Sequence, residues 1–168
     1  VFIILYFIGQ FGDLAIAGYG TAIRYEQLYL LPVLGLNTAV LAMVGQNYGA
    51  RNIIRVNKIY NNALLYGCGF MFVSGFIIFF TAEFAVSLFT DNKEVIIYGT
   101  TYLKITALME PIYPIFFISN ALIQGLKKAN IVMYLTLFRM VILPISLLWF
   151  LIFYLDSTFA FVFWGLLI

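Results

Sequence analysis

Residues 24–55 read RYEQLYLLPVLGLNTAVLAMVGQNYGARNIIR. Charges of both signs open this stretch, and a Gly/Asn segment with two arginines closes it. Between them, residues 28–44 carry no charge and have only Tyr29, Asn37 and Thr38 as polar groups. An α-helix over the uncharged part is about 25 Å long, and residues 24–27 extend it to about 30 Å. That is the thickness of the hydrocarbon core of a bilayer, so the stretch predicts a membrane-spanning helix.

The composition of the whole chain agrees with this stretch. Of the 168 residues, 64% are hydrophobic and only 10% are charged, whereas soluble domains carry about 25% charged residues. So few charges cannot solvate the surface of a soluble globule of this size. We therefore expect an all-α, polytopic transmembrane helix bundle surrounded by membrane lipid. The net charge of +2 gives no reason to expect a nucleic acid partner.

The side chains that build metal and catalytic sites are scarce. The chain has one cysteine, Cys68, and no histidine, so the ligand sets of zinc and haem sites are missing. Residues 45–50 include two glycines but lack the Gly-Lys-Ser/Thr ending of a phosphate-binding loop. We expect no resident metal, no organic cofactor and no enzymatic activity.

About six helices are expected, in one unit over residues 1–168. Their predicted bounds are 1–11, 14–46, 59–82, 95–123, 131–155 and 159–168. The chain begins with Val1 and ends with Ile168, each inside an apolar run. The first and last helices are therefore expected to be truncated, and the chain to be a fragment of a longer protein.

Small residues along the predicted third helix allow close contact between membrane helices. They are Gly67, Gly69, Ser74 and Gly75.

The basic residues of the connectors predict the orientation. Connectors 47–58 and 124–130 lie on one side and hold five basic residues, which are Arg51, Arg55, Lys58, Lys127 and Lys128. The connectors of the other side hold only Lys93. Because cytoplasmic loops carry the excess of Lys and Arg, connectors 47–58 and 124–130 are predicted to be cytoplasmic.

Five ionisable residues lie inside predicted helices, and each is a candidate ion-binding or substrate-binding residue. They are Arg24, Glu26, Lys104, Glu110 and Arg139. Such residues are costly in hydrocarbon and usually face the interior of a bundle or a wet cavity. Depths counted at about 1.5 Å per residue place Glu26 near the level of Lys104, and Glu110 and Arg139 nearer the middle. Two pairs are predicted: Glu26 with Lys104 or Arg24, and Glu110 with Arg139.

The segment Glu110-Pro111-Ile112-Tyr113-Pro114 predicts a break in the fourth helix. Its two prolines remove the hydrogen bonds to the backbone carbonyls of Ala107 and Glu110. Such a break is tolerated in a membrane only where protein or a water-filled cavity satisfies the carbonyls, and broken helices are recurrent in transporter binding sites. A carboxylate there can exchange a proton or hold a cation. The alternative is a kinked helix with a structural glutamate.

Two further prolines, Pro32 and Pro144, are also expected to bend their helices. Among the aromatic residues, Tyr29 and Tyr113 are expected to line a cavity in which rings bind flat organic cations.

Several segments together resemble the multidrug and toxic compound extrusion (MATE) transporters. Those that resemble the eighth helix of that family and its following loop are residues 22–27, 31–39 and 44–50, together with Arg55. Those that resemble its ninth-to-tenth helix region are Phe89-Thr90-Asp91, Tyr102-Leu103, and Gln124-Gly125 after Pro111. The element Gly-Gln-Asn-x-Gly-Ala with its upstream Pro-x-x-Gly-Leu is the most specific part of the match.

The resemblance implies twelve helices in two six-helix lobes, of which this chain would be most of the C-terminal lobe. It implies a partner in the missing N-terminal lobe of the same chain, small-molecule organic cations or amphiphiles as substrates, and H⁺ or Na⁺ as the coupling ion. One branch of the family carries a sodium-linked acid in helix seven and an aspartate in helix ten, where this chain offers Glu110. Another branch has its essential aspartate in the N-terminal lobe. The coupling ion therefore stays open.

From this resemblance we expect a secondary efflux transporter of the plasma membrane that works by alternating access. A lipid-linked oligosaccharide flippase of the same superfamily is the alternative, and it would line its cavity with a surplus of basic residues. A membrane-embedded enzyme would need a nucleophile, a base or a metal set, none of which is visible. A channel or structural protein would not need broken helices with buried carboxylates.

Overall fold

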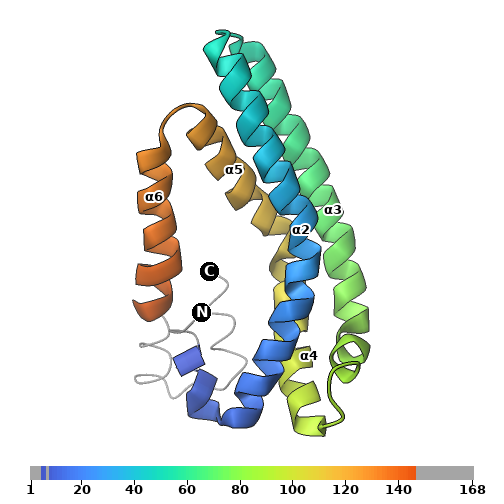
Figure 1. The fold of residues 1–168 in the computed structure, drawn as a ribbon. Helices are drawn as coiled ribbons and strands as arrows, with labels where there is room; N and C mark the ends of the chain where they lie inside the picture. The colour runs from blue at the N-terminus through green and yellow to red at the C-terminus, as the bar shows by residue number, and fades with distance from the viewer. Residues whose placement is uncertain (1–4, 7, 147–168) are drawn as a thin grey trace.

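The computed structural model describes residues 5, 6 and 8–146, and in this part of the chain every regular element is helical. The elements are η1 (Gly9–Phe11), α2 (Asp13–Gly49), α3 (Ile53–Ser87), α4 (Lys93–Met109), η2 (Glu110–Ile112), α5 (Tyr113–Gly125), α6 (Ala129–Leu137) and the π-helical η3 (Phe138–Ile142). Figure 1 shows them as long helices joined by short connections. The predicted helix 159–168, the end of helix 131–155 and most of the start of helix 1–11 lie outside the described residues.

The helices are longer than the sequence predicts, and the connections are shorter. α3 begins at Ile53 rather than at residue 59, because the side chain of Asn52 accepts a hydrogen bond from the Arg55 N–H and caps the helix there. Its other end is Ser87 rather than residue 82. Asn92 caps α4 in the same way, accepting from the N–H groups of Glu94 and Val95. Polar residues that the sequence assigned to loops therefore lie in the end turns of helices.

The predicted break at Pro111 and Pro114 is confirmed. α4 ends at Met109, a 3₁₀ turn covers residues 110–112, and α5 begins at Tyr113. The carbonyl of Glu110, which Pro114 cannot reach with a hydrogen bond, accepts the N–H of Tyr113 instead. The tighter turn thus satisfies one of the two carbonyls that the prolines set free.

The other two prolines behave differently from each other. α2 continues through Pro32 as one α-helix. Pro144 is buried and lies directly after the π-helical turn Phe138–Ile142, a combination typical of a bent helix.

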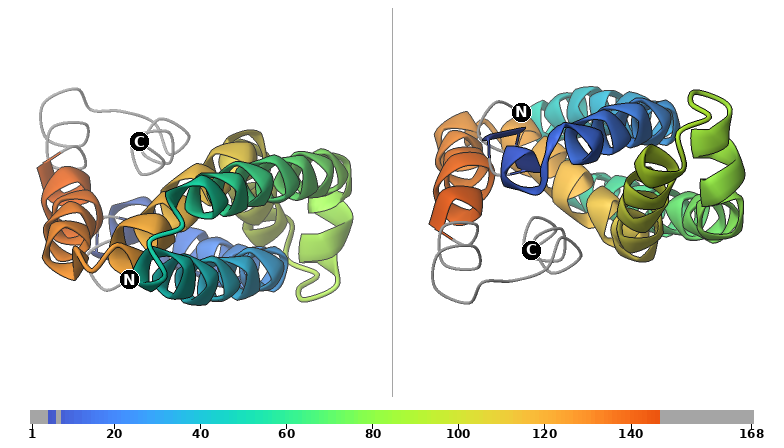
Figure 2. Two further views of the ribbon diagram at one scale, coloured as in Figure 1. Left: turned by 90° about the horizontal axis from the view of Figure 1, so that it is seen from above. Right: turned by 90° about the horizontal axis from the view of Figure 1, so that it is seen from below.

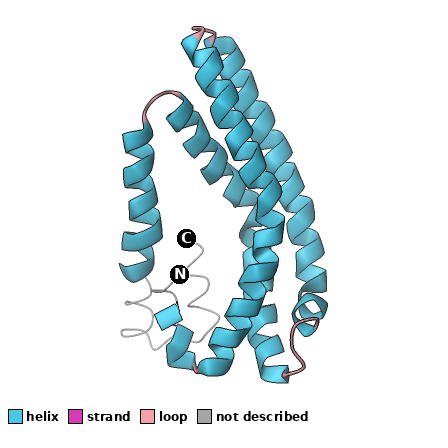
Figure 3. Cartoon of the chain, viewed as in Figure 1, coloured by secondary structure: helices cyan, strands magenta, loops and turns pink. Residues whose placement is uncertain are grey.

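Helices α2, α3 and the α4–α5 pair pack against one another along their lengths. The connection at residues 126–128 then carries the chain to α6, which packs against α5. Figure 1 and the end-on views of Figure 2 show α6 at the side of this three-part bundle rather than within it. Figure 3 shows the same arrangement with the short connections in pink.

Two apolar clusters hold the bundle, one toward each end. The first is formed by residues of α2, α3 and α4 around Ala22, Ile78 and Leu103. The second joins Val44 of α2 with residues of α3 and with Ile118 of α5. The level between them is occupied by residues 26–33 of α2, 71–75 of α3 and the 3₁₀ turn.

The two ends of the bundle differ in charge as the sequence predicts. The α2–α3 and α5–α6 connections lie at one end, and the α3–α4 connection lies at the other (Figure 1). The five basic residues counted above are at or next to the first two connections, and Lys93 begins α4 at the opposite end.

Two of the glycines of α3 lie against neighbouring helices, and one does not. A Cβ on Gly67 would lie 3.0 Å from Ile118 and 3.1 Å from Pro114, so this glycine lets α5 approach closely. A Cβ on Gly75 would overlap the carbonyl oxygen of Ala107, the other carbonyl that the prolines leave free. Gly69 is exposed, and a Cβ there would meet nothing within 4 Å. The prediction that Gly69 makes a helix contact is therefore wrong within the described chain, because it points away from the bundle.

We predict that Gly75→Ala destabilises the bundle by about 1–3 kcal/mol, the range for overpacking a tight contact. The added methyl group would push α3 away from the last turn of α4, which contains the carbonyl group of Ala107. The measurement is the thermal unfolding midpoint of the full-length protein in detergent. Gly69→Ala is the matched control and should change the midpoint little; equal loss in both variants would contradict the close contact at Gly75.

Candidate functional site

Two acidic side chains are buried at the level between the two apolar clusters. Glu26 of α2 is 6% exposed and Glu110 of η2 is 1% exposed. The two carboxyl groups are close enough to repel each other electrostatically. Because an uncompensated charge is expensive in a medium of low dielectric, this level needs hydrogen-bond donors, protons or cations.

Tyrosine hydroxyl groups supply the donors for Glu26. The Tyr102 hydroxyl on α4 donates to Oε2 of Glu26, and the Tyr113 hydroxyl on α5 donates to Oε1 at 3.3 Å. The two tyrosines come from opposite sides of the proline break. Glu26 therefore ties α2 to both halves of the broken helix, and we call these three residues the tyrosine clamp.

Among the described residues, no hydroxyl group donates to Glu110 as the two tyrosines do to Glu26. Neither carboxyl oxygen of Glu110 accepts a well-formed hydrogen bond from the described residues, although both are buried. The hydroxyl of Ser74 on α3 is close to the carboxyl group of Glu110. Gly75, the next residue of α3, has no side chain and so leaves room for this carboxyl group. A buried carboxyl that lacks protein partners is a place where a proton or a cation can bind.

Aromatic rings surround the two carboxyl groups. Tyr19 meets Tyr102 edge to face, with ring centres 5.1 Å apart. On either side of Glu26 along α2, Tyr25 and Tyr29 are in edge contact at 5.0 Å, and the Tyr29 hydroxyl donates to that of Tyr25. Tyr29 is also close enough to Glu110 to interact with its charge. Oxygen atoms and ring faces, both of which attract cations, are thus concentrated at this level.

The predicted ion pairs are wrong in the described chain. Glu26 contacts neither Arg24 nor Lys104, because both basic side chains are exposed and point away from the buried face. Lys104 Nζ instead lies 5.9 Å from the centre of the Phe79 ring. The sequence spacing gave the correct depth for these residues but not the direction in which each one points around its helix.

Arg139 does not pair with Glu110 either. It lies in the π-helical turn after α6, with its guanidinium carbon 4.0 Å from the centre of the Phe116 ring. Its charge does act on the Tyr113 hydroxyl. Arg139 is therefore close enough to the tyrosine clamp to act on Tyr113, and in the described part of the chain no ion pair joins it to Glu26 or Glu110.

Sequence reasoning missed Tyr102 and Ser74. A signal for Tyr102 was present, because Tyr102, Thr106 and Glu110 are spaced four residues apart and so share one face of the helix. With 12 tyrosines in the chain, that spacing alone did not distinguish Tyr102 from tyrosines at the membrane surface.

Two carboxyl groups, tyrosine hydroxyl groups and ring faces thus lie together at this level, and these are groups with which protons and cations interact. Within residues 5, 6 and 8–146, no three His, Cys, Asp or Glu side chains come together as a metal site. Four helical segments of the described part of the chain are long and apolar enough to cross a membrane: 13–49, 53–87, 93–125 and 129–146. A polytopic helical membrane protein with acids buried at the level between its apolar clusters is the class that this fold and site define.

Comparison with known proteins identifies the group within that class. The MatE family matches residues 1–150, and the chain belongs to this family. It is 26% identical over 118 residues to the probable multidrug resistance protein YpnP of Bacillus subtilis, covering 70% of this chain and 26% of that protein. It is 25% identical to the probable multidrug resistance protein NorM of Pseudomonas syringae, covering 94% of this chain and 35% of NorM.

The fold agrees with a solved member of the family. The structure of the MATE transporter ClbM in complex with Rb⁺ superimposes with a TM-score of 0.91 at 26% identity, covering 98% of this chain and 38% of ClbM. The chain thus spans about a quarter to a third of the curated relatives YpnP and NorM. Members of this family are membrane transporters rather than enzymes.

We predict that Tyr102→Phe lowers stability by about 1–3 kcal/mol, because it leaves a buried oxygen of Glu26 without its donor. Tyr113→Phe should have a smaller effect, since its hydrogen bond is longer and its side chain is half-buried. The measurement is the thermal midpoint of the full-length protein in detergent, with Tyr66→Phe on the exposed face of α3 as the control.

A double-mutant cycle distinguishes the clamp from general packing. In a Glu26→Leu background the carboxylate is gone, so removing the Tyr102 hydroxyl should cost less than it does in the native protein. Equal costs in both backgrounds would show that Tyr102 does not act through Glu26.

Proposed function

We propose that this chain is part of a secondary active transporter that exports organic cations or amphiphiles in exchange for H⁺ or Na⁺. The proposal is supported by membership of the MatE family and by relatives whose names describe multidrug resistance. The observation that carries it is the pair of buried carboxyl groups, Glu26 and Glu110, at a break in a membrane helix.

The coupling ion is proposed to bind at Glu110. Its carboxyl oxygens are buried without a well-formed hydrogen bond from the described residues, and the carboxyl of Glu26 adds negative potential from close by. A proton or Na⁺ there would compensate the charge, with the Ser74 hydroxyl beside it. That the related ClbM was solved with Rb⁺ is consistent with cation binding in this family.

Alternating access follows if the ion and the substrate prefer different conformations. A ligand shifts an equilibrium only by its difference in affinity between the two states. The break between α4 and α5 is a natural hinge, because its 3₁₀ turn is stabilised by fewer helical hydrogen bonds. Binding at Glu110, which lies on that turn, can therefore change the angle between the two halves.

The rest of the transporter is proposed to be a second lobe. The chain would form most of the C-terminal six-helix lobe of a twelve-helix protein, and substrate would bind between the lobes. In the plasma membrane, the connections at residues 50–52 and 126–128 would face the cytoplasm, because the basic residues gather there.

The alternative, a flippase for a lipid-linked oligosaccharide, is less well supported by the site. A diphosphate headgroup requires several basic side chains in contact with it. At the level of Glu26 and Glu110 the described residues provide two acids and tyrosines, with Arg139 beyond the clamp.

We predict that Glu110→Gln abolishes ion-driven efflux, since a neutral amide cannot exchange a proton or balance a bound cation. The measurement is efflux of a fluorescent organic cation from proteoliposomes that contain the full-length protein, driven by a proton gradient and, separately, by a sodium gradient. The gradient that sustains efflux in the native protein identifies the coupling ion.

The control is Glu83→Gln on the exposed end of α3, which should transport normally. If the Glu110 variant folds and transports like the native protein, Glu110 is a structural residue. If the native protein shows no efflux under either gradient, the antiporter proposal fails.

A further inference from the structure

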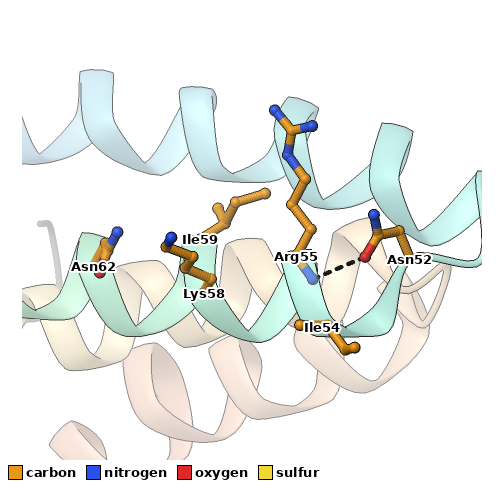
Figure 4. A pocket seen from close by; sticks show the side chains of 6 residues that line it. All are labelled: Asn52, Ile54, Arg55, Lys58, Ile59 and Asn62. Carbon is orange, nitrogen blue, oxygen red and sulfur yellow. Dashed lines mark hydrogen bonds between the residues drawn. The ribbon is translucent and has the colours of Figure 1, made fainter.

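An open pocket of about 500 Å³ lies at the basic end of α3, far along the helix from the buried carboxyl groups. Its lining residues are Asn52, Ile54, Arg55, Lys58, Ile59 and Asn62. Figure 4 shows Arg55 and Lys58 extending from neighbouring turns of the helix, with Asn52 and Asn62 at the two ends of the row.

The chemistry of the pocket suits an anion. It has two cationic side chains and two amides, and none of the described residues that line it is acidic. The Asn52 side-chain oxygen accepts the Arg55 backbone N–H at 3.0 Å, which leaves its NH₂ group as a donor. Among the described residues, no carboxylate forms an ion pair with Arg55 or Lys58, because the acids of this part of the chain lie elsewhere along the helices.

The level of the pocket corresponds to the lipid headgroups. Residues 63–82 of α3 hold no charge, and 20 helical residues span about 30 Å, the thickness of the hydrocarbon core. Lys58 then lies about 7 Å beyond the end of this run and Arg55 about 12 Å beyond it. The headgroup layer is about 5–8 Å thick on each side, within reach of both flexible side chains.

The pocket also continues into an exposed apolar stripe. Steps of three or four residues along α3 lead from Asn62 to Tyr66, Phe70 and Val73, whose side chains are 70%, 47% and 58% exposed. A phospholipid with its phosphate at Arg55 and Lys58 would have its acyl chains alongside this stripe. A soluble anion would make no use of it.

We propose that this pocket binds the headgroup phosphate of an anionic phospholipid in the leaflet at the basic end of the bundle. Arg55 and Lys58 provide the charge, Asn52 and Asn62 donate hydrogen bonds, and Ile59, which lies nearer the hydrocarbon core than Arg55, contacts the glycerol and upper acyl region. The bound lipid holds the end of α3 at a defined depth in the membrane. This site is separate from the transport site and does not depend on the substrate or the coupling ion.

The test is native mass spectrometry of the full-length protein with phosphatidylglycerol and, separately, phosphatidylcholine. The native protein should retain phosphatidylglycerol in preference. Each basic residue contributes about fivefold to attraction by anionic lipid, so Arg55→Gln with Lys58→Gln should weaken phosphatidylglycerol binding about thirtyfold. The charge-retaining pair Arg55→Lys and Lys58→Arg should keep most of the binding and shows that the protein folds.

The matched control is Lys127→Gln with Lys128→Gln, which removes the same charge at the same end of the bundle. It should leave phosphatidylglycerol binding within about twofold of native, since screening by salt weakens attraction between distant exposed charges. Equal loss in both double variants would show diffuse attraction and overturn the proposal. So would unchanged binding in the Arg55/Lys58 variant, equal retention of phosphatidylcholine, or displacement of the lipid by millimolar inorganic phosphate.

Discussion

The tyrosine clamp on Glu26 is the interaction on which the rest of the described structure depends. A carboxylate at this depth has no water to solvate it, so its hydrogen-bond donors must come from the protein. Tyr102 and Tyr113 supply them from the two sides of the proline break. The same two bonds that satisfy Glu26 therefore also hold α4 and α5 in register with α2, although the 3₁₀ turn interrupts the α-helix between them.

The break itself creates the functional asymmetry between the two acids. Glu26 lies on an intact helix and has donors, whereas Glu110 lies on the 3₁₀ turn, where its oxygens are buried without well-formed hydrogen bonds from the described residues. Close packing of Gly75 against Ala107 limits how the turn can relax. The apolar clusters on either side leave this level as the place where a change in charge can alter the geometry of the bundle.

Much of this could be predicted from the sequence. The break at Pro111 and Pro114 follows from the covalent structure of proline, and the depth of Glu26 and Glu110 in the membrane follows from their positions along apolar helices. The pairing of the acids could not be predicted. Depth along a helix follows from counting residues, but the partner of Glu26 depends on how α2 and α4 are rotated about their axes, and the rotation turns Lys104 outward and Tyr102 inward.

The sequence by itself determined the class of the protein, its membrane-spanning segments, the helix break and the basic end, because length, hydropathy and charge are properties of local segments. Only the tertiary structure decided that Glu26 binds two tyrosines, that Glu110 lacks donors among the described residues, and that Gly75 but not Gly69 is a contact. Those outcomes depend on the distance and rotation between helices, which are set by the packing of all the side chains together.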